Sequence, residues 1–191
     1  EAVEIALQAA MSHTKRTKFI SVEGGYHGHS IGTLSIGRSD YRKWYSNLLP
    51  DCYKVNPPLD GRAAREVETM LKKGDIAAYI SEPIVCNLAV ERPTKEYFDI
   101  VQKACKKYGT VFIIDEVATG FGRTGTIFAC ELYNLEPDIL CLGKAITGGY
   151  GVLGATMMTE AVAKSMSFDF SFYSTFGWHP RNTAAALANL G

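Results

Sequence analysis

The sequence predicts an α/β domain with three layers, in which helices cover both faces of a mostly parallel sheet. Short apolar runs alternate along the chain with amphipathic helical stretches, which is the order found in such domains. Several runs are apolar throughout, as in strands buried on both faces of a parallel sheet. The length of 191 residues suits one domain with a sizeable core. We therefore expect a single unit over residues 1–191 with right-handed crossovers.

Three helices are expected before residue 110. The first opens the chain, where apolar residues recur at helical spacing: Ala2, Ile5, Ala6 and Ala9. The second covers residues 61–73 and ends at Gly74. The third covers 94–108, with Thr94 as its N-terminal cap and Gly109 as its end. The first pattern begins abruptly, so we expect the chain to lack the residues that would cap it.

Four strands are expected between and after these helices. They are the apolar runs 18–22, 76–80, 111–114 and 139–142. The first leads into Gly24-Gly25, and the second is stopped by Pro83. Residues 38–60, rich in Tyr and Pro, receive no element. We expect them to form a surface excursion near the site or a segment that faces a partner.

Composition excludes several functional classes. Twenty Lys and Arg balance twenty Asp and Glu, so no net field would recruit nucleic acid or an anionic membrane. No apolar run approaches the roughly 20 residues that span a bilayer, and residues 1–5 lack the basic, apolar and small-residue order of a signal peptide. The five cysteines are scattered without CxxC spacing, which argues against zinc and disulfides. These features predict a cytoplasmic protein.

Ionisable residues follow the predicted strands. Glu82, Asp115 and Lys144 each come at the end of an apolar run, and the first strand opens onto Tyr26-His27. Because ligands of parallel sheets bind beyond the carboxyl ends of the strands, one pocket would collect these groups. Each also has a plain structural interpretation. Asp115 could cap a helix, Lys144 could lie on the surface, Glu82 could end a strand, Tyr26 could pack, and His27 could be solvated or a cap.

Together, these residues suggest a specific chemistry. A lysine in a partly desolvated pocket has a lowered amine pKa and can form a Schiff base with an aldehyde. A carboxylate that faces a pyridine nitrogen keeps that nitrogen protonated and improves the ring as an electron sink. The chain between Asp115 and Lys144 leaves room for one crossover, so both can end at the same site.

Several motifs in order resemble the class III, or ω-type, aminotransferases, which depend on pyridoxal 5′-phosphate (PLP) and have fold type I. The longest reads Asp-Glu-Val-Ala-Thr-Gly-Phe-Gly-Arg-Thr-Gly over 115–125, and Gly-Lys-Ala-Ile-Thr-Gly-Gly follows at 143–149. Shorter matches are Tyr-His-Gly at 26–28, Glu-Pro-Ile at 82–84, and Ser-Thr-Phe-Gly at 174–177 before an Ala-rich helix. The group includes ornithine, acetylornithine and GABA aminotransferases. The resemblance covers essentially the whole chain.

The resemblance implies a role for each matched residue. Lys144 would form the Schiff base with PLP and move the proton during catalysis, and Asp115 would pair with the pyridine nitrogen. The residues expected at the cofactor are Tyr26, His27, Glu82, Asp115, Val117, Lys144 and Thr175. Val117 and Tyr26 would pack on opposite ring faces. His27 has no catalytic role, and Arg123 has either a structural or a functional one. Thr175 would reach the phosphate of a neighbouring subunit, which implies a homodimer.

The chain also departs from the family pattern. Members are longer, with an N-terminal segment, a phosphate-binding loop and a C-terminal small domain, so we expect a central fragment with weak cofactor binding and little turnover alone. Ornithine- and GABA-type members commonly carry a glutamate where this chain has Asn87. Trp178 and His179 precede Pro180, where Gly-Asn is usual. This pair would reshape the pocket or pack at an interface, and we favour packing.

The expected function is transfer of an amino group from an ω-amine or amino acid to a 2-oxo acid. Racemases, aminomutases and phospho-lyases of the same fold would look similar in this region. A non-catalytic fragment that acts in dimerisation or partner binding is the alternative from another class. A nucleotide-binding Rossmann domain is disfavoured, because no G-x-G-x-x-G turn follows the first strand.

Overall fold

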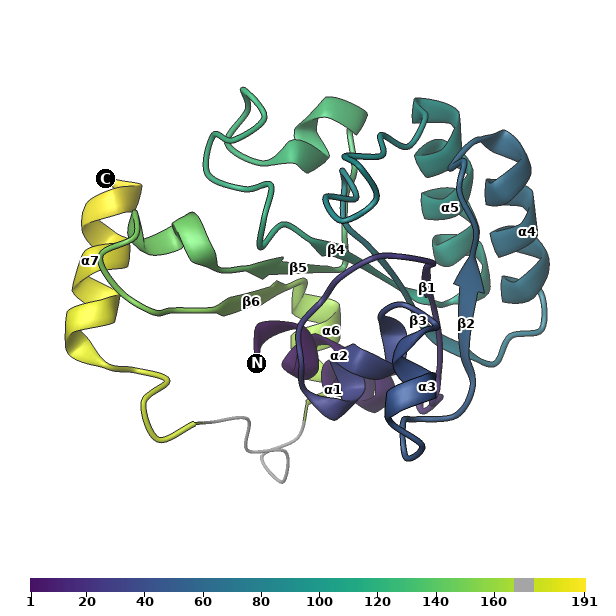
Figure 1. Cartoon of the computed structure of the whole chain (residues 1–191), viewed down its shortest axis with the longest axis horizontal. Helices are drawn as coiled ribbons and strands as arrows, with labels where there is room; N and C mark the ends of the chain where they lie inside the picture. The colour runs from purple at the N-terminus through teal and green to yellow at the C-terminus, as the bar shows by residue number, and fades with distance from the viewer. Residues whose placement is uncertain (167–173) are drawn as a thin grey trace.

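A computed structural model, which describes residues 1–166 and 174–191, contains a six-stranded sheet between two helical layers (Figure 1). The strands are β1 (Lys18–Val22), β2 (Cys52–Val55), β3 (Ile76–Ser81), β4 (Val111–Asp115), β5 (Ile139–Leu142) and β6 (Ala155–Met158). Their order is β2-β1-β3-β4-β5-β6. Every neighbouring pair is parallel except β5 and β6. The predicted α/β fold with a mostly parallel sheet is confirmed.

Helices cover both faces of this sheet (Figure 1). One face carries α1 (Ala2–Thr14), α2 (Ile31–Ile36), α3 (Tyr41–Trp44) and α6 (Glu160–Lys164), and the other carries α4 (Gly61–Leu71) and α5 (Lys95–Tyr108). Each layer has its own core: Leu7 and Phe19 belong to the first, and Tyr79 and Phe98 to the second. Burial of such side chains is the main favourable term in folding.

A seventh helix lies beyond β6. This helix, α7 (Pro180–Leu190), begins with Pro180 and packs on the short 3₁₀ turn η2 (Lys144–Thr147). A second 3₁₀ turn, η1 (Ala129–Tyr133), precedes β5. Helix α7 is the Ala-rich helix expected after residues 174–177.

The predicted ends of α5 are found in the structure. The Thr94 hydroxyl accepts a hydrogen bond from the Tyr97 N–H at 3.1 Å, and Gly109 adopts the left-handed conformation (φ 61°) that closes the helix. Helix α4 has a cap that the sequence reasoning did not identify, because Asp60 accepts from the N–H groups of Arg62 and Ala63. Helix α5 therefore begins and ends for local chemical reasons, and α4 begins for one, although it ends at Leu71 and not at the predicted residue 73.

The stretch 38–60, which received no predicted element, supplies α3 and the edge strand β2. Its strand was missed because Cys-Tyr-Lys-Val lacks a continuous apolar pattern. Lys54 donates a hydrogen bond to the Ser21 hydroxyl at 2.8 Å, and burial lowers the pKa of this lysine to about 8. Strand β6 was also missed, since its side chains are only partly buried.

The strand order places a topological switch point between β1 and β3. The connection from β1 leads outward to β2, whereas the next one crosses back to β3 on the other side. Loops diverge at such a point, and this leaves a crevice at the carboxyl ends of the strands. Among the described residues, no helix is both long and apolar enough to cross a membrane. All five cysteines are free; the cytoplasmic location stays a prediction.

Candidate functional site

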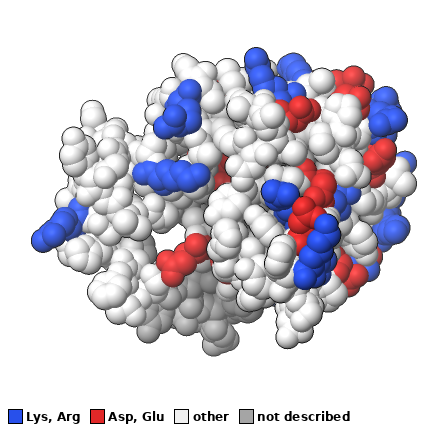
Figure 2. All heavy atoms as spheres, in the orientation of Figure 1, with Lys and Arg blue, Asp and Glu red and all other residues white. Residues whose placement is uncertain are grey.

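A wide cleft of about 1290 Å³ opens at the carboxyl ends of the strands. Its walls come from the loops after β1, β3, β4 and β5, from the first turns of α1, and from residues 174–183. Figure 2 shows this hollowed face, with acidic and basic side chains on the rim of the hollow. Of the seven residues expected at the cofactor, six line the cleft: Tyr26, His27, Glu82, Asp115, Val117 and Lys144. Sites for small molecules are commonly concave spaces of this kind.

Asp115 and His27 form a buried pair on the cleft floor. Asp115 is the last residue of β4, and its Oδ2 lies 2.7 Å from His27 Nδ1. Only 4% of the Asp115 side chain and 1% of the His27 side chain are exposed. Asp115 Oδ1 also accepts the Val117 N–H at 3.0 Å. The carboxylate is therefore fixed at both oxygens, and His27 is neither solvated nor a helix cap.

The second nitrogen of His27 is not used in this way. His27 Nε2 is buried without a hydrogen-bond partner among the described residues. A buried polar atom of this kind usually has a partner, so an unpaired one marks a place where a polar group is still to be supplied.

Glu82 ties the turn after β1 to the end of β3. Its carboxylate accepts the backbone N–H of Tyr26 at 3.1 Å and that of Cys86 at 3.3 Å. Burial raises the pKa of Glu82 above its ordinary value, and the nearby His27 partly opposes that rise. Glu82 is more than the end of a strand, because it fixes the backbone that carries Tyr26.

Tyr26 and Val117 are half-buried and line the cleft from different strand ends. The Tyr26 hydroxyl lies 3.0 Å from His29 Nδ1, so this ring is held at its polar end. Val117 packs against the backbone of Gly143, where an added Cβ would come within 3.3 Å of Val117 Cγ1. A side chain before Lys144 would therefore push Val117 away by a few tenths of an ångström, so glycine lets the β4 and β5 loops approach each other.

Lys144 begins η2 directly after β5 and faces the same cleft as Asp115. Its side chain is exposed. The expectation of a partly desolvated lysine is therefore wrong for this chain, because the cleft is wide and open around it. The backbone of Lys144 has φ 44°, in the left-handed region that non-glycine residues rarely adopt. The lysine is thus held by its turn rather than by burial.

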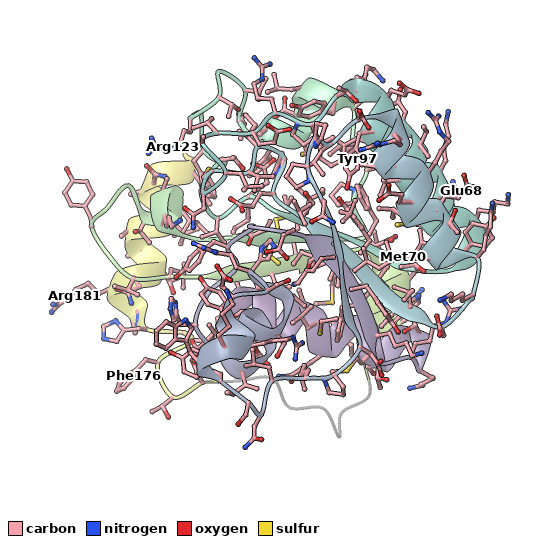
Figure 3. All side chains as sticks on the ribbon, turned by 45° about the vertical axis from the view of Figure 1, so that its right-hand side comes forward. Glu68, Met70, Tyr97, Arg123, Phe176 and Arg181 are labelled. Carbon is pink, nitrogen blue, oxygen red and sulfur yellow. The ribbon has the colours of Figure 1, made fainter. Side chains whose placement is uncertain are left out.

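The remaining sequence predictions fall at the rim or outside the cleft. Thr175 is exposed and is not among the lining residues, although its neighbours Phe176 and Trp178 are. Trp178 is 85% exposed, so within this chain it does not pack. Asn87 lines the cleft, at the position where the family resemblance led us to compare it with a glutamate. Arg123 lies exposed on the loop after β4, outside the cleft (Figure 3).

Sequence reasoning missed a second group of lining residues. They come from α1, from the loop before β6 and from α7, and include Val3, Glu4, Gln8, Val152 and Asn182. None stands at a strand end or within a recognisable motif. Their contribution depends on how these elements pack, so no sequence signal would have found them.

The residues present fit PLP. A buried carboxylate that is paired with a histidine suits a protonated pyridine nitrogen, and an accessible lysine in the same cleft suits its aldehyde. The unpaired His27 Nε2 and the close packing of Gly143 on Val117 support a built site rather than an accidental hollow. Among the described residues, no group of three or more His, Cys, Asp or Glu could hold a metal ion.

Comparisons with known proteins show the family and the fold. The family described as aminotransferase class-III matches residues 1–191. An amine transaminase from an uncultivated Pseudomonas species in its PLP-bound form is 33% identical, with a TM-score of 0.90. A thermostable (S)-enantioselective ω-transaminase from Thermomicrobium roseum is 30% identical, also with a TM-score of 0.90. The ornithine aminotransferase of Toxoplasma gondii is 28% identical, with a TM-score of 0.88.

These matches cover 99% of this chain but only 49%, 48% and 46% of the three transaminase chains, in the order given. The chain therefore spans about half the length of the structures that it matches.

Proposed function

Because the chain belongs to the class-III aminotransferase family, we propose that it carries the PLP-binding large domain of an aminotransferase. The enzyme would move an amino group from an ω-amine or amino acid to a 2-oxo acid. The observation that supports this most is the buried His27–Asp115 pair, which shares one cleft with Lys144. PLP, when bound, supplies an electron sink for charge that develops on the substrate carbon.

Each residue would contribute through its own chemistry. Asp115, fixed at both oxygens, would hold a proton on the pyridine nitrogen, and His27 would keep that carboxylate in place. The Lys144 amine would attach the cofactor aldehyde and then carry the proton to and from the substrate carbon. Tyr26 and Val117 would hold the ring from two sides, and Glu82 would position Tyr26 through the backbone.

We also propose that the active unit is a homodimer. Thr175 is exposed and lies outside the cleft of its own chain, whereas Phe176 and Trp178 line it. This placement supports a role for Thr175 in the site of a second subunit, at the cofactor phosphate. Size-exclusion chromatography with light scattering tests the dimer, and a monomer that binds PLP fully would contradict it.

An absorbance titration with PLP, followed by borohydride reduction and peptide mass mapping, tests the cofactor proposal. We expect a visible band in the native chain and the reduced adduct on Lys144. The Lys144→Ala variant should lose both, whereas Lys103→Ala, which removes an exposed lysine of α5, should keep both. Adducts spread evenly over surface lysines in the native chain would contradict the assignment.

A donor screen then tests the reaction class. Transamination predicts that each amine consumed yields one amino acid from the added 2-oxo acid, which chromatography measures directly. Racemisation would invert the donor without any acceptor, and a phospho-lyase would release phosphate. Either result would replace aminotransfer while leaving the cofactor site intact.

A further inference from the structure

The backbone of Lys144 is held in an unfavourable conformation. Its φ of 44° lies in the left-handed region, which is unfavourable for a residue that carries a Cβ. A residue stays there only where its surroundings hold it. The segment 143–152, which we call the lysine turn, therefore needs contacts that fix it from outside.

One face of α7 lies against the lysine turn. Asn182, Ala186 and Asn189 stand at spacings of four and three residues, so they share one side of the helix. Ala186 is buried in a small cluster with Leu142 and Ile146, on either side of Lys144 in the chain. Arg181, by contrast, projects away from the body of the molecule (Figure 3). The helix is thus docked through this single face.

Two asparagines on this face bind the lysine turn at its two ends. Asn189 Nδ2 donates to the carbonyl oxygens of Ala145 at 2.9 Å and Ile146 at 3.3 Å. Asn182 Nδ2 donates to the carbonyl oxygen of Val152 at 2.7 Å. The Ala145 carbonyl also accepts the Gly148 N–H at 2.9 Å, so Asn189 adds a second donor there. No backbone N–H of the described residues donates to the carbonyls of Ile146 and Val152, so the asparagine amides satisfy oxygens that would otherwise rely on solvent.

Two glycines of the turn lie close to the asparagines of α7. Gly148 has φ 59°, and a Cβ at this position would lie 2.9 Å from Asn189 Oδ1. A Cβ on Gly151 would likewise lie 2.9 Å from Asn182 Oδ1. Glycine at 148 therefore adopts the left-handed bend without strain, and glycine at both positions leaves the asparagine amides room to reach the backbone.

We propose that the Asn182–Ala186–Asn189 face of α7 is a clamp that holds the lysine turn and so positions the Lys144 amine in the cleft. The two asparagines are positioning residues, since neither is placed at the cofactor. The clamp is a property of the chain itself, but its value for catalysis rests on the proposed role of Lys144.

Hydrogen exchange of the cofactor-free chain tests the clamp directly. Asn189→Asp keeps the size of the side chain but replaces the donor with an acceptor that faces two carbonyls. We expect amides of residues 143–152 to exchange about three to ten times faster, as for the loss of one or two hydrogen bonds. Asn189→Gln, which keeps an amide donor, should recover part of the protection. Asn56→Asp, an exposed site far along the chain, should change nothing in this segment.

A PLP titration of the same variants gives the second readout. In Asn189→Asp, the apparent Kd for PLP should rise about three- to tenfold and the visible band should shift, while the melting temperature stays within a few degrees. Asn189→Gln should restore the band. Unchanged exchange and an unchanged band in Asn189→Asp would overturn the clamp.

The two proposals fail differently. If the native chain forms no band with PLP, the cofactor proposal fails for this chain, whereas the exchange experiment still decides the clamp. If the native chain labels Lys144 and Asn189→Asp matches it in both readouts, the clamp alone is wrong.

Discussion

The two sides of the cleft are held by different means. The carboxylate floor (His27, Glu82 and Asp115) is buried, and its carboxylates accept hydrogen bonds from backbone or lie against a histidine. The lysine turn is exposed at Lys144 and is fixed through its backbone by α7. The floor is thus part of the core, whereas the turn is an attachment to it. Changes in the floor should cost stability, and changes in the turn should cost function alone.

Asp115→Ala should give the largest loss of stability. It leaves His27 buried without its partner, and breaking a buried pair in this way typically costs 3–5 kcal/mol. We expect a loss of about 3 kcal/mol in urea unfolding. The double variant His27→Ala with Asp115→Ala should lose less stability than the sum of the two single variants. It removes both members of the pair, so no unpaired polar group is left buried. Strict additivity would show that the pair is not coupled.

Glu82→Gln should cost about 1–2 kcal/mol at pH 7, because an amide cannot accept both backbone N–H groups as the carboxylate does. The pH dependence of stability gives a second test of Glu82. Burial raises the folded pKa of Glu82, so the folded state binds more protons than the unfolded state between the ordinary and the raised pKa. Stability should therefore fall as the pH rises through that window.

The Glu82→Gln variant should lack this part of the pH dependence. Glu66→Gln, which changes an exposed glutamate of α4, should keep it. Urea unfolding between pH 4 and 7 measures how stability depends on pH. Equal slopes of stability against pH in the native chain and in Glu82→Gln would show that the Glu82 carboxylate does not titrate as proposed.

Lys144→Gly should have the smallest effect on stability. Glycine removes the strain of the left-handed φ, and its greater freedom in the unfolded chain offsets most of that gain. The expected change is less than about 1 kcal/mol, on the stabilising side, while the PLP adduct disappears. A loss above 2 kcal/mol would mean that the Lys144 side chain itself stabilises the turn.

Residues at strand ends could be predicted because their positions follow from local pattern. Asp115 and Lys144 follow buried apolar runs, and parallel strands bring their carboxyl ends to one edge. Thr94 and Gly109 likewise mark the ends of α5 by chemistry that acts within a few residues. The β2 strand could not be predicted, since Lys54 interrupts its apolar pattern and is accommodated by the Ser21 hydroxyl of a neighbouring strand and the Ser35 carbonyl of α2.

The sequence by itself determined the fold class, the two ends of α5 and the residue types gathered at the sheet edge, because these depend on periodicity and on short-range hydrogen bonding. Tertiary structure alone decided that His27 pairs with Asp115, that Lys144 is exposed, and that Asn182 and Asn189 hold its turn. The contacts of His27 with Asp115 and of the two asparagines with the lysine turn join segments tens of residues apart. Such contacts follow from the way in which the layers pack, which no local pattern in the chain encodes.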